Sequence, residues 1–228
     1  MKKIAIPALV LITLLILVSS GPAWALDPVD IGVEIHGGWS DFSNPDSDNN
    51  LDSHPIGGIG LEARSGPLSL ELSADWIKTD VKKDLQLSSS FFGIAATAKG
   101  QLTIIPILLT GRYHLGAKEG VIDPYIGMGG GLYLLSFDPG STVYGIIPKS
   151  PNSLSQNIHY HNTAGFHVNL GFDIHITPVL ALTLDSRYVW AGSKITYSDQ
   201  LAGFDTGNDT LRLDSWVTTF GIKYYFKN

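Results

Sequence analysis

Hydrophobic and polar side chains alternate through the last stretch of the chain, from Leu211 to Phe226. A period of two predicts an extended strand, because successive side chains of a β-strand point to opposite sides. One face carries polar groups such as Ser215 and Lys223, and the other face is apolar and aromatic along most of its length. Such a face is typical of a strand that crosses a membrane. It consists of Trp216, Thr218, Phe220, Ile222, Tyr224 and Phe226.

The same alternation recurs earlier in the chain. In Leu68 to Ile77, leucines and Trp76 alternate with serines and acids, and residues 165–176 and 179–190 follow the same rule. Further strands are predicted over 29–40, 54–64, 101–115 and 122–137, which makes about eight in total.

Short and long connections between these strands alternate. Residues 65–67, 116–120 and 177–178 are short connections, whereas 41–53, 79–100, 138–162 and 191–210 are long ones. This order predicts an all-β fold: an eight-stranded antiparallel up-and-down transmembrane β-barrel with short periplasmic turns and long extracellular loops. We expect one barrel domain over residues 26–228.

A soluble barrel of the lipocalin type would also show alternating strands, but its apolar face would point inward. The placement of aromatic residues favours the membrane barrel. They lie near strand ends, on or beside the apolar face, as the aromatic girdles at a membrane interface do. At one end these residues are Trp39, Trp76, Tyr188, Trp190 and Trp216, and at the other Tyr224 and Phe226.

The start of the chain has the features of a secretory signal peptide. Lys2 and Lys3 precede an apolar run over residues 4–18, and Ala23-Trp24-Ala25 fits the small-x-small pattern of a cleavage site. An uncleaved anchor is the alternative, but the run is shorter than the ~20 residues of a spanning helix. We therefore predict a cleaved signal peptide over residues 1–25 and location in the outer membrane of a Gram-negative bacterium.

Charge and cysteine content limit the kinds of partner and site that the chain is expected to have. The chain has a formal net charge of −6 and no cysteine, which argues against nucleic acid as a partner, against disulfides and against thiolate metal sites. We expect no cofactor, and partners in outer-membrane lipid, lipopolysaccharide and the outer-membrane assembly machinery. That machinery reads an aromatic C-terminal pattern, although Lys227 and Asn228 extend past Phe226 here.

Four segments of the chain form a recognisable series in their order and spacing: LTIIPILLTGRYHLG, IDPYIGMGGGLYLLSF, NTAGFHVNLGFDIHITPVLALTLDSRYVW and LRLDSWVTTFGIKYYF. Their most specific parts are Pro106 within a strand, Pro124-Tyr125-Ile126-Gly127, Gly171-Phe172-Asp173 and Leu213-Asp214-x-Trp216. Together these segments resemble the OmpW family of small outer-membrane proteins. The resemblance implies an eight-stranded barrel with a narrow lumen that takes up small hydrophobic molecules passively and releases them sideways into the membrane.

Pro106 is the candidate for a lateral opening, because proline lacks an N–H and interrupts strand pairing. Glycines on the next strand would leave space inside the barrel. The alternative is that Pro106 relieves curvature and the glycines let a narrow barrel close. The glycines are Gly127, Gly129, Gly130 and Gly131, and the candidate inner apolar contacts are Leu108, Tyr125 and Tyr133.

Charged residues at inward positions predict an ionic network in the lumen. Unpaired charges in so narrow a space would be costly, so we expect the two arginines to pair with the acids. Such a network is more structural than functional, and it favours lateral exit over a continuous pore. Its members are Glu71, Asp75, Arg112, Asp185 and Arg187.

The loops contain apolar residues that could form an entrance funnel, or could equally pack the loops together. These are Phe42, Tyr144, Ile146 and Ile147, with Leu51, Phe91 and Phe92 around them. A funnel favours the uptake of small hydrophobic solutes. The alternative function is a non-transporting surface protein, such as an adhesin, a phage or colicin receptor, or an envelope stabiliser.

Three other chemical sites are disfavoured. The acids Asp46, Asp48 and Asp52 lack the glycine and glutamate of a calcium loop. His159, His161 and His167 have no further ligand at metal spacing, so no metal is predicted. An acyl-transferring enzyme would need a serine beside a histidine, but Ser186 is predicted to face lipid, so we expect no enzyme.

Overall fold

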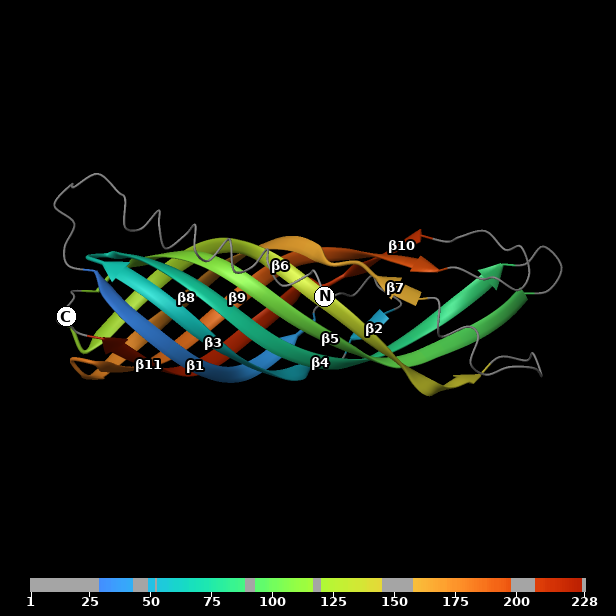
Figure 1. Cartoon of the computed structure of the whole chain (residues 1–228), viewed down its shortest axis with the longest axis horizontal. Helices are drawn as coiled ribbons and strands as arrows, with labels where there is room; N and C mark the ends of the chain where they lie inside the picture. Colours follow the sequence, from blue (N-terminus) through green and yellow to red (C-terminus); the bar gives the residue numbers. More distant parts are fainter. Residues whose placement is uncertain are drawn as a thin grey trace, which may run out of the picture.

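The computed structural model describes residues 29–42, 49–51, 53–88, 93–116, 120–144, 158–197 and 208–226. Within these residues the regular structure is entirely β (Figure 1). None of the described segments forms a helix that is long and apolar enough to span a bilayer. The strands are β1 Asp30–Asp41, β2 Asn49–Leu51, β3 His54–Ser65, β4 Leu68–Ser88, β5 Gly93–His114, β6 Ile122–Tyr144, β7 Ile158–Tyr160, β8 Thr163–Thr177, β9 Leu180–Tyr197, β10 Asn208–Arg212 and β11 Ser215–Phe226.

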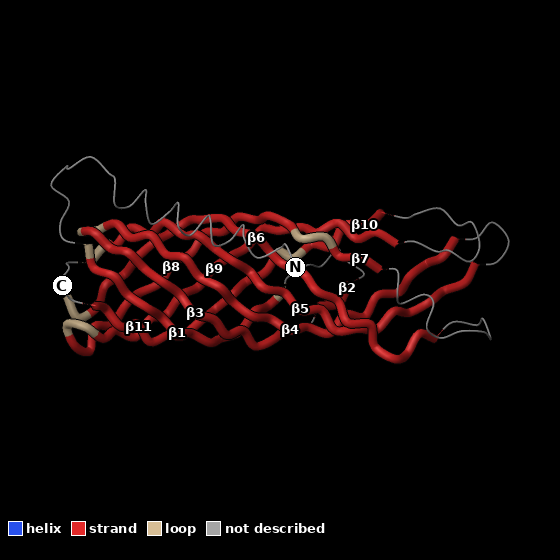
Figure 2. The backbone as a smooth tube through the Cα atoms, in the orientation of Figure 1, coloured by secondary structure: helices blue, strands red, loops and turns tan. Residues whose placement is uncertain are grey.

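Eight strands of the described chain close into an antiparallel barrel. The order runs β11, β1, β3, β4, β5, β6, β8, β9, and β9 pairs with β11 to complete the ring. The short strands lie outside this ring: β2 pairs with β4, and β7 and β10 pair with β9. Figure 2 shows the strands wound around a long axis. The structure thus confirms the predicted fold class.

Tight connections join the strands at one end of the barrel, which we call the turn end. Gly66 has a φ of 58° in the turn between β3 and β4, a conformation that favours glycine. The turn from β8 to β9 is held by Thr177, whose Oγ1 accepts hydrogen bonds from the amides of Val179 and Leu180. The strands β4 and β5 reach to the opposite end, which we call the loop end (Figure 1).

Four strands extend farther toward the loop end than the sequence predicts. Residues 79–100 were expected to form a loop, but β4 and β5 stay paired through most of them, as far as Ser88 and Gly93. Similarly, β6 continues to Tyr144 and β9 to Tyr197. The loop prediction was wrong because alternation reports which face meets lipid, whereas pairing needs only backbone hydrogen bonds and continues beyond the apolar band.

The apolar face of each strand points out of the barrel. Phe220, Ile222 and Phe166 are 66%, 57% and 59% exposed. Aromatic residues near the loop end cluster on β9 and its neighbour β11: the ring of Tyr188 is 4.6 Å from that of Trp190 on the same strand and 5.8 Å from that of Trp216 on β11. At the turn end, the rings of Tyr224 and Phe226 are 5.2 Å apart. An apolar exterior between two aromatic bands fits a membrane, not water.

Candidate functional site

The turn-end half of the lumen is filled by polar side chains that meet across the barrel axis. Each of the eight barrel strands supplies at least one of them, and all are buried. We call this set the ionic plug. It comprises Glu34, Glu62, Glu71, Asp75, Arg112, Tyr125, Asp173, Asp185, Arg187 and Lys223.

Both predicted arginines pair with acids in the plug. Arg112 donates from Nη1 to Glu62 Oε2 at 3.1 Å and from Nη2 to Glu71 Oε1 at 2.7 Å. Arg187 lies 3.4 Å from Asp185 and 3.8 Å from Asp75. The structure therefore brings together the five residues that the sequence assigned to a lumen network.

Lys223 joins acids from three other strands, which the sequence did not predict. Its Nζ donates to Glu62 at 2.9 Å and to Asp173 at 3.0 Å, and it lies 3.5 Å from Glu34. Tyr225 also donates to Glu62, at 3.1 Å. Lys223 belongs to the last barrel strand and Glu62 to the second, so only closure of the barrel brings them together. The alternation of the sequence places both residues at inward-facing positions of their strands, which we call inward parity. It does not predict which residues they pair with.

Tyr125 is part of the plug and not of an apolar wall. Its hydroxyl donates to Asp185 Oδ2 at 3.0 Å, and its ring lies 4.6 Å from the guanidinium of Arg112. The expectation that Tyr125 contacts apolar solutes together with Leu108 and Tyr133 is therefore wrong. Its inward direction was predicted correctly, but its level along the barrel axis was not.

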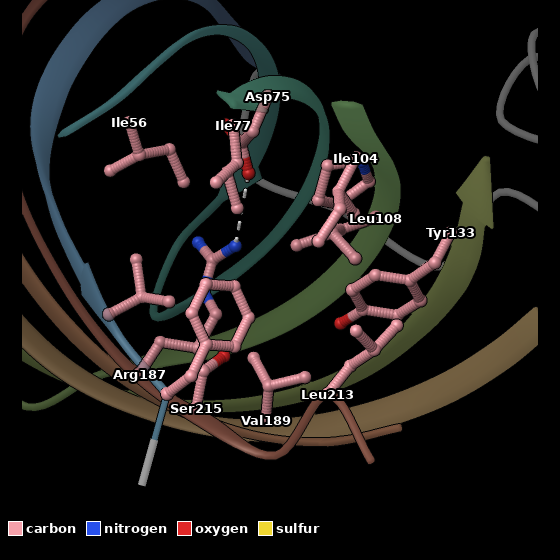
Figure 3. A pocket seen from close by; sticks show the side chains of 13 residues that line it. Ile56, Asp75, Ile77, Ile104, Leu108, Tyr133, Arg187, Val189, Leu213 and Ser215 are labelled. Atoms are coloured by element: carbon pink, nitrogen blue, oxygen red, sulfur yellow. Dashed lines mark ion pairs between the residues drawn. The ribbon is translucent and has the colours of Figure 1, made fainter. Parts of the chain in front are cut away.

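Above the plug, toward the loop end, the lumen changes to an apolar pocket (Figure 3). The cavity within this pocket is about 20 Å³, room for one or two water molecules. Asp75 and Arg187 belong to both the pocket and the plug. The pocket contains the predicted Phe42, Pro106, Leu108 and Tyr133, and also Ile56, Ile77, Ile104, Val189, Leu213, Ser215 and Val217.

The additional apolar residues of the pocket had a signal in the sequence. Ile104-Ile105 and Val189-Trp190 put an apolar residue on both faces of their strands, whereas nearer the turn end the inward face is polar. Loss of alternation near the loop end of a strand therefore marks an apolar lumen. Phe42 lines the pocket directly after β1. Tyr144 is the last residue of β6, and Ile146, Ile147, Phe91 and Phe92 lie outside the described residues.

The barrel wall beside the pocket is interrupted at Pro106. β4 and β5 pair in one register up to Ala74 and Ile107 and again from Ile77 and Ile104. Between them, Asp75 and Trp76 have no ladder partner on β5. Proline has no N–H, so the hydrogen bond that this residue would donate is missing. On its other side, Pro106 pairs normally with Tyr133 of β6. The interruption is thus local and lies between β4 and β5.

The glycines of β6 leave no free space. A Cβ at Gly129 would lie 2.8 Å from the ring of His167, and one at Gly131 would meet Leu108 and the carbonyl of Ile107. Gly130 lies next to the carbonyl of Gly165 on β8. The expectation of open space was wrong, because neighbouring side chains and backbone occupy it. The alternative, that glycine allows a narrow barrel to close, agrees with these contacts.

Two other groups of side chains were considered for a metal site and for an enzyme active site. His114, Asp123 and Asp173 lie close enough at the turn end to hold a metal ion. In this structure Asp123 Oδ2 binds Arg64 and His114, and Asp173 binds Lys223, so these carboxylates already pair with side chains of the protein. Ser186 and His167 are separated by the wall: His167 is buried in the lumen, whereas Ser186 shares the outward parity of Leu182. The Asp46–Asp48 loop and His159 contribute no described side chain.

Comparison with known proteins identifies one family and several solved structures of similar fold. The model of the OmpW family matches residues 70–226. A protein of Rickettsia conorii named as an outer membrane protein is 26% identical over 124 residues, which are 54% of this chain and 43% of that relative. The chain thus matches less than half the length of this relative.

Three similar solved structures are of an outer-membrane protein, a surface protein and a protein in lipid bilayers. OprG of Pseudomonas aeruginosa has a TM-score of 0.67 at 17% identity, covering 89% of this chain and 99% of OprG. Neisserial surface protein A has a TM-score of 0.54 at 14% identity, covering 88% and 100%. AlkL, solved in lipid bilayers, has a TM-score of 0.52 at 16% identity, covering 91% and 95%. At these identities the likeness is one of fold.

Proposed function

This chain belongs to the OmpW family of outer-membrane β-barrels, and from this premise we propose that it is a channel for the passive uptake of small hydrophobic molecules. A solute enters at the loop end, reaches the apolar pocket and leaves sideways through the wall beside Pro106. The ionic plug prevents it from continuing along the axis. The observation that supports this route most strongly is that the pocket, the upper edge of the plug and the interrupted wall meet around Asp75 and Pro106.

The level of the interruption is given by residues that belong to both features. Pro106 lines the pocket, and Asp75, which has lost its ladder partner on β5, is also a pocket residue. Asp75 is in turn 3.8 Å from Arg187 of the plug. A solute that stops on the plug is therefore beside the weakest part of the wall.

Exit at this level releases an apolar solute directly into the hydrocarbon core of the bilayer. The core of a bilayer dissolves such a molecule readily, whereas the sugar-coated outer leaflet holds it up. A protein needs only to carry the solute past that leaflet and release it into the hydrocarbon. Trp76 and Ile105 lie on the outward side of the gap, and Trp76 is 56% exposed.

The wall must open for release, because the cavity holds only one or two waters. Opening requires β4 and β5 to separate over a few residues, and each ladder bond contributes a net ~1 kcal/mol to their pairing. The bond that Pro106 cannot make is absent already. Local separation at this point therefore costs less than anywhere along a complete ladder.

A disulfide staple across the gap tests this route. The chain has no cysteine, so the pair Trp76→Cys and Ile105→Cys can form one defined bond between β4 and β5 in the oxidising periplasm. We expect uptake of a small apolar solute by whole cells to fall, when the bond is formed, to that of cells lacking the protein. Chemical reduction should restore it.

The matched control places the same staple on another hairpin. Phe172 and Leu184 are ladder partners on β8 and β9 with the same outward parity, and Phe172→Cys with Leu184→Cys should leave uptake unchanged. If the oxidised staple at Trp76 and Ile105 leaves uptake at the wild-type rate, the lateral route is wrong.

The surroundings of the channel are part of the proposal. Lipopolysaccharide and phospholipid would contact the outward face, and the assembly machinery would read the aromatic pattern that ends at Phe226. Residues 1–25 would act as the cleaved export signal.

A second candidate function is a non-transporting surface protein. The continuation of β4 and β5 beyond the apolar band favours it, because paired strands present a fixed surface at the loop end. Uptake that is equal in cells with and without the protein would support this alternative and contradict transport.

A further inference from the structure

One polar group in the apolar pocket has no partner among the described residues. Tyr133 is 4% exposed, and its hydroxyl forms no hydrogen bond. A buried hydroxyl without a partner is unfavourable, and a phenylalanine would fill the same wall without that penalty. Figure 3 shows the hydroxyl turned into the pocket, toward the side where Arg187 lies. The pocket therefore offers an unused donor.

Two other tyrosines of the lumen differ from Tyr133 because their hydroxyl groups donate hydrogen bonds. Tyr125 donates to Asp185, and Tyr225 donates to Glu62. Both lie in the plug, where acids are close. Tyr133 lies above the plug among isoleucine and leucine side chains. Arg187, which also lines the pocket, has a second unused donor, its buried Nε.

From this arrangement we propose that the pocket takes an apolar molecule with one neutral hydrogen-bond acceptor, such as a ketone or an ester, and that the hydroxyl of Tyr133 donates to it. The inference rests on the proposed function and specifies its solute. The cavity of about 20 Å³ is smaller than such a solute, so the apolar side chains of the pocket must move apart as it enters. The apolar body of the solute then packs on Ile77, Ile104 and Leu108, and its carbonyl oxygen lies toward Tyr133.

The charges around the pocket argue for a neutral head and against a carboxylate. Arg187 is shared between Asp75 and Asp185, so two carboxylates already surround one guanidinium. A fatty-acid anion would add a third negative charge in a space with few polar neighbours. The oxygens of Asp75 are engaged by Arg187 and by His36, whose Nε2 lies 2.6 Å away. The two groups without a partner, the Tyr133 hydroxyl and Arg187 Nε, are both hydrogen-bond donors, so a solute that pairs with them must supply an acceptor.

Methyl NMR tests the inference on the whole protein in lipid nanodiscs. Isotope-labelled isoleucine methyl groups report on the pocket through Ile56, Ile77 and Ile104. Two solutes of similar size, n-octane and methyl hexyl ketone, are titrated at matched concentrations in the lipid. We expect both to shift these methyl signals, with the ketone binding about fivefold tighter, the usual worth of one neutral hydrogen bond.

Tyr133→Phe should reduce ketone binding to the octane level and leave octane binding unchanged. Tyr188→Phe is the matched control, because Tyr188 has outward parity, and it should keep the ketone preference. Equal binding of both solutes by the wild type, or a preference that persists in Tyr133→Phe, would overturn the inference while leaving the channel proposal intact. If neither solute shifts the methyl signals, the pocket is no solute site and both proposals fail.

Discussion

The same eight strands enclose two regions of opposite chemistry, the ionic plug and the apolar pocket above it. In the plug, charged side chains are held by partners on other strands, so moving one side chain breaks several directional contacts. In the pocket, most contacts are between apolar side chains, which are not directional and can rearrange at lower cost. The comparison teaches that a barrel can be closed along its axis and still have a part that is able to open.

The largest expected effect comes from removing a cation from the plug. Lys223→Met leaves Glu62 and Asp173 buried without their ammonium partner, which should lower the free energy of unfolding by about 3–5 kcal/mol. Urea unfolding of the protein refolded in lipid vesicles measures this. Lys194→Met, at an exposed position of β9, should change it by less than about 0.5 kcal/mol. A Lys223 variant as stable as the wild type would show that the plug does not hold the strands together.

A smaller effect is expected where the pocket is overfilled. In Gly131→Ala the new methyl group would collide with Leu108 and with the carbonyl of Ile107, which should cost about 1–3 kcal/mol in the same unfolding assay. Gly111→Ala is the control, because its Cβ would meet only the Met128 carbonyl, at 3.9 Å. Equal stabilities of the two variants would mean that β6 can move away and that the glycines are not needed for closure.

The smallest change in stability, but a clear change in dynamics, is expected at the wall. Pro106→Ala supplies the missing N–H, which contributes a net ~1 kcal/mol to pairing. Hydrogen–deuterium exchange of the β4 amides near Asp75 should slow, and uptake of apolar solutes should decrease. Pro55→Ala, at an exposed position of β3 that does not line the pocket, should leave uptake unchanged. Faster exchange in the Pro106 variant would mean that proline does not weaken this wall.

The features that could be predicted from the sequence are those that depend on one strand at a time. Alternation gave the outward face of Leu68 to Trp76 correctly, and inward parity placed Arg112 and Asp185 in the lumen. The level of a residue along the axis was not predictable, because it depends on the tilt and register of all the strands together. For this reason Tyr125 was assigned to an apolar wall and was found in the plug.

Contacts made by closure of the barrel were also beyond prediction. Lys223 and Glu62 are 161 residues apart in the chain, and no local pattern relates them. The extension of β4 and β5 past residue 77 was missed for a different reason: strands beyond the membrane need no apolar face. The gap at Pro106 was predictable from the missing N–H, but its position beside the pocket was not.

The most direct test of the central claim is to find where an apolar solute travels. An alkane that carries a photoreactive diazirine can be cross-linked to the protein in native outer membranes, and the labelled residues identified by mass spectrometry. We predict labels in the pocket, at Leu108 and Ile104, and on the outward side of the gap, at Trp76 and Ile105. Labels on turn-end lumen residues such as Tyr225 and His175 would show a solute passing the plug and would contradict the lateral route.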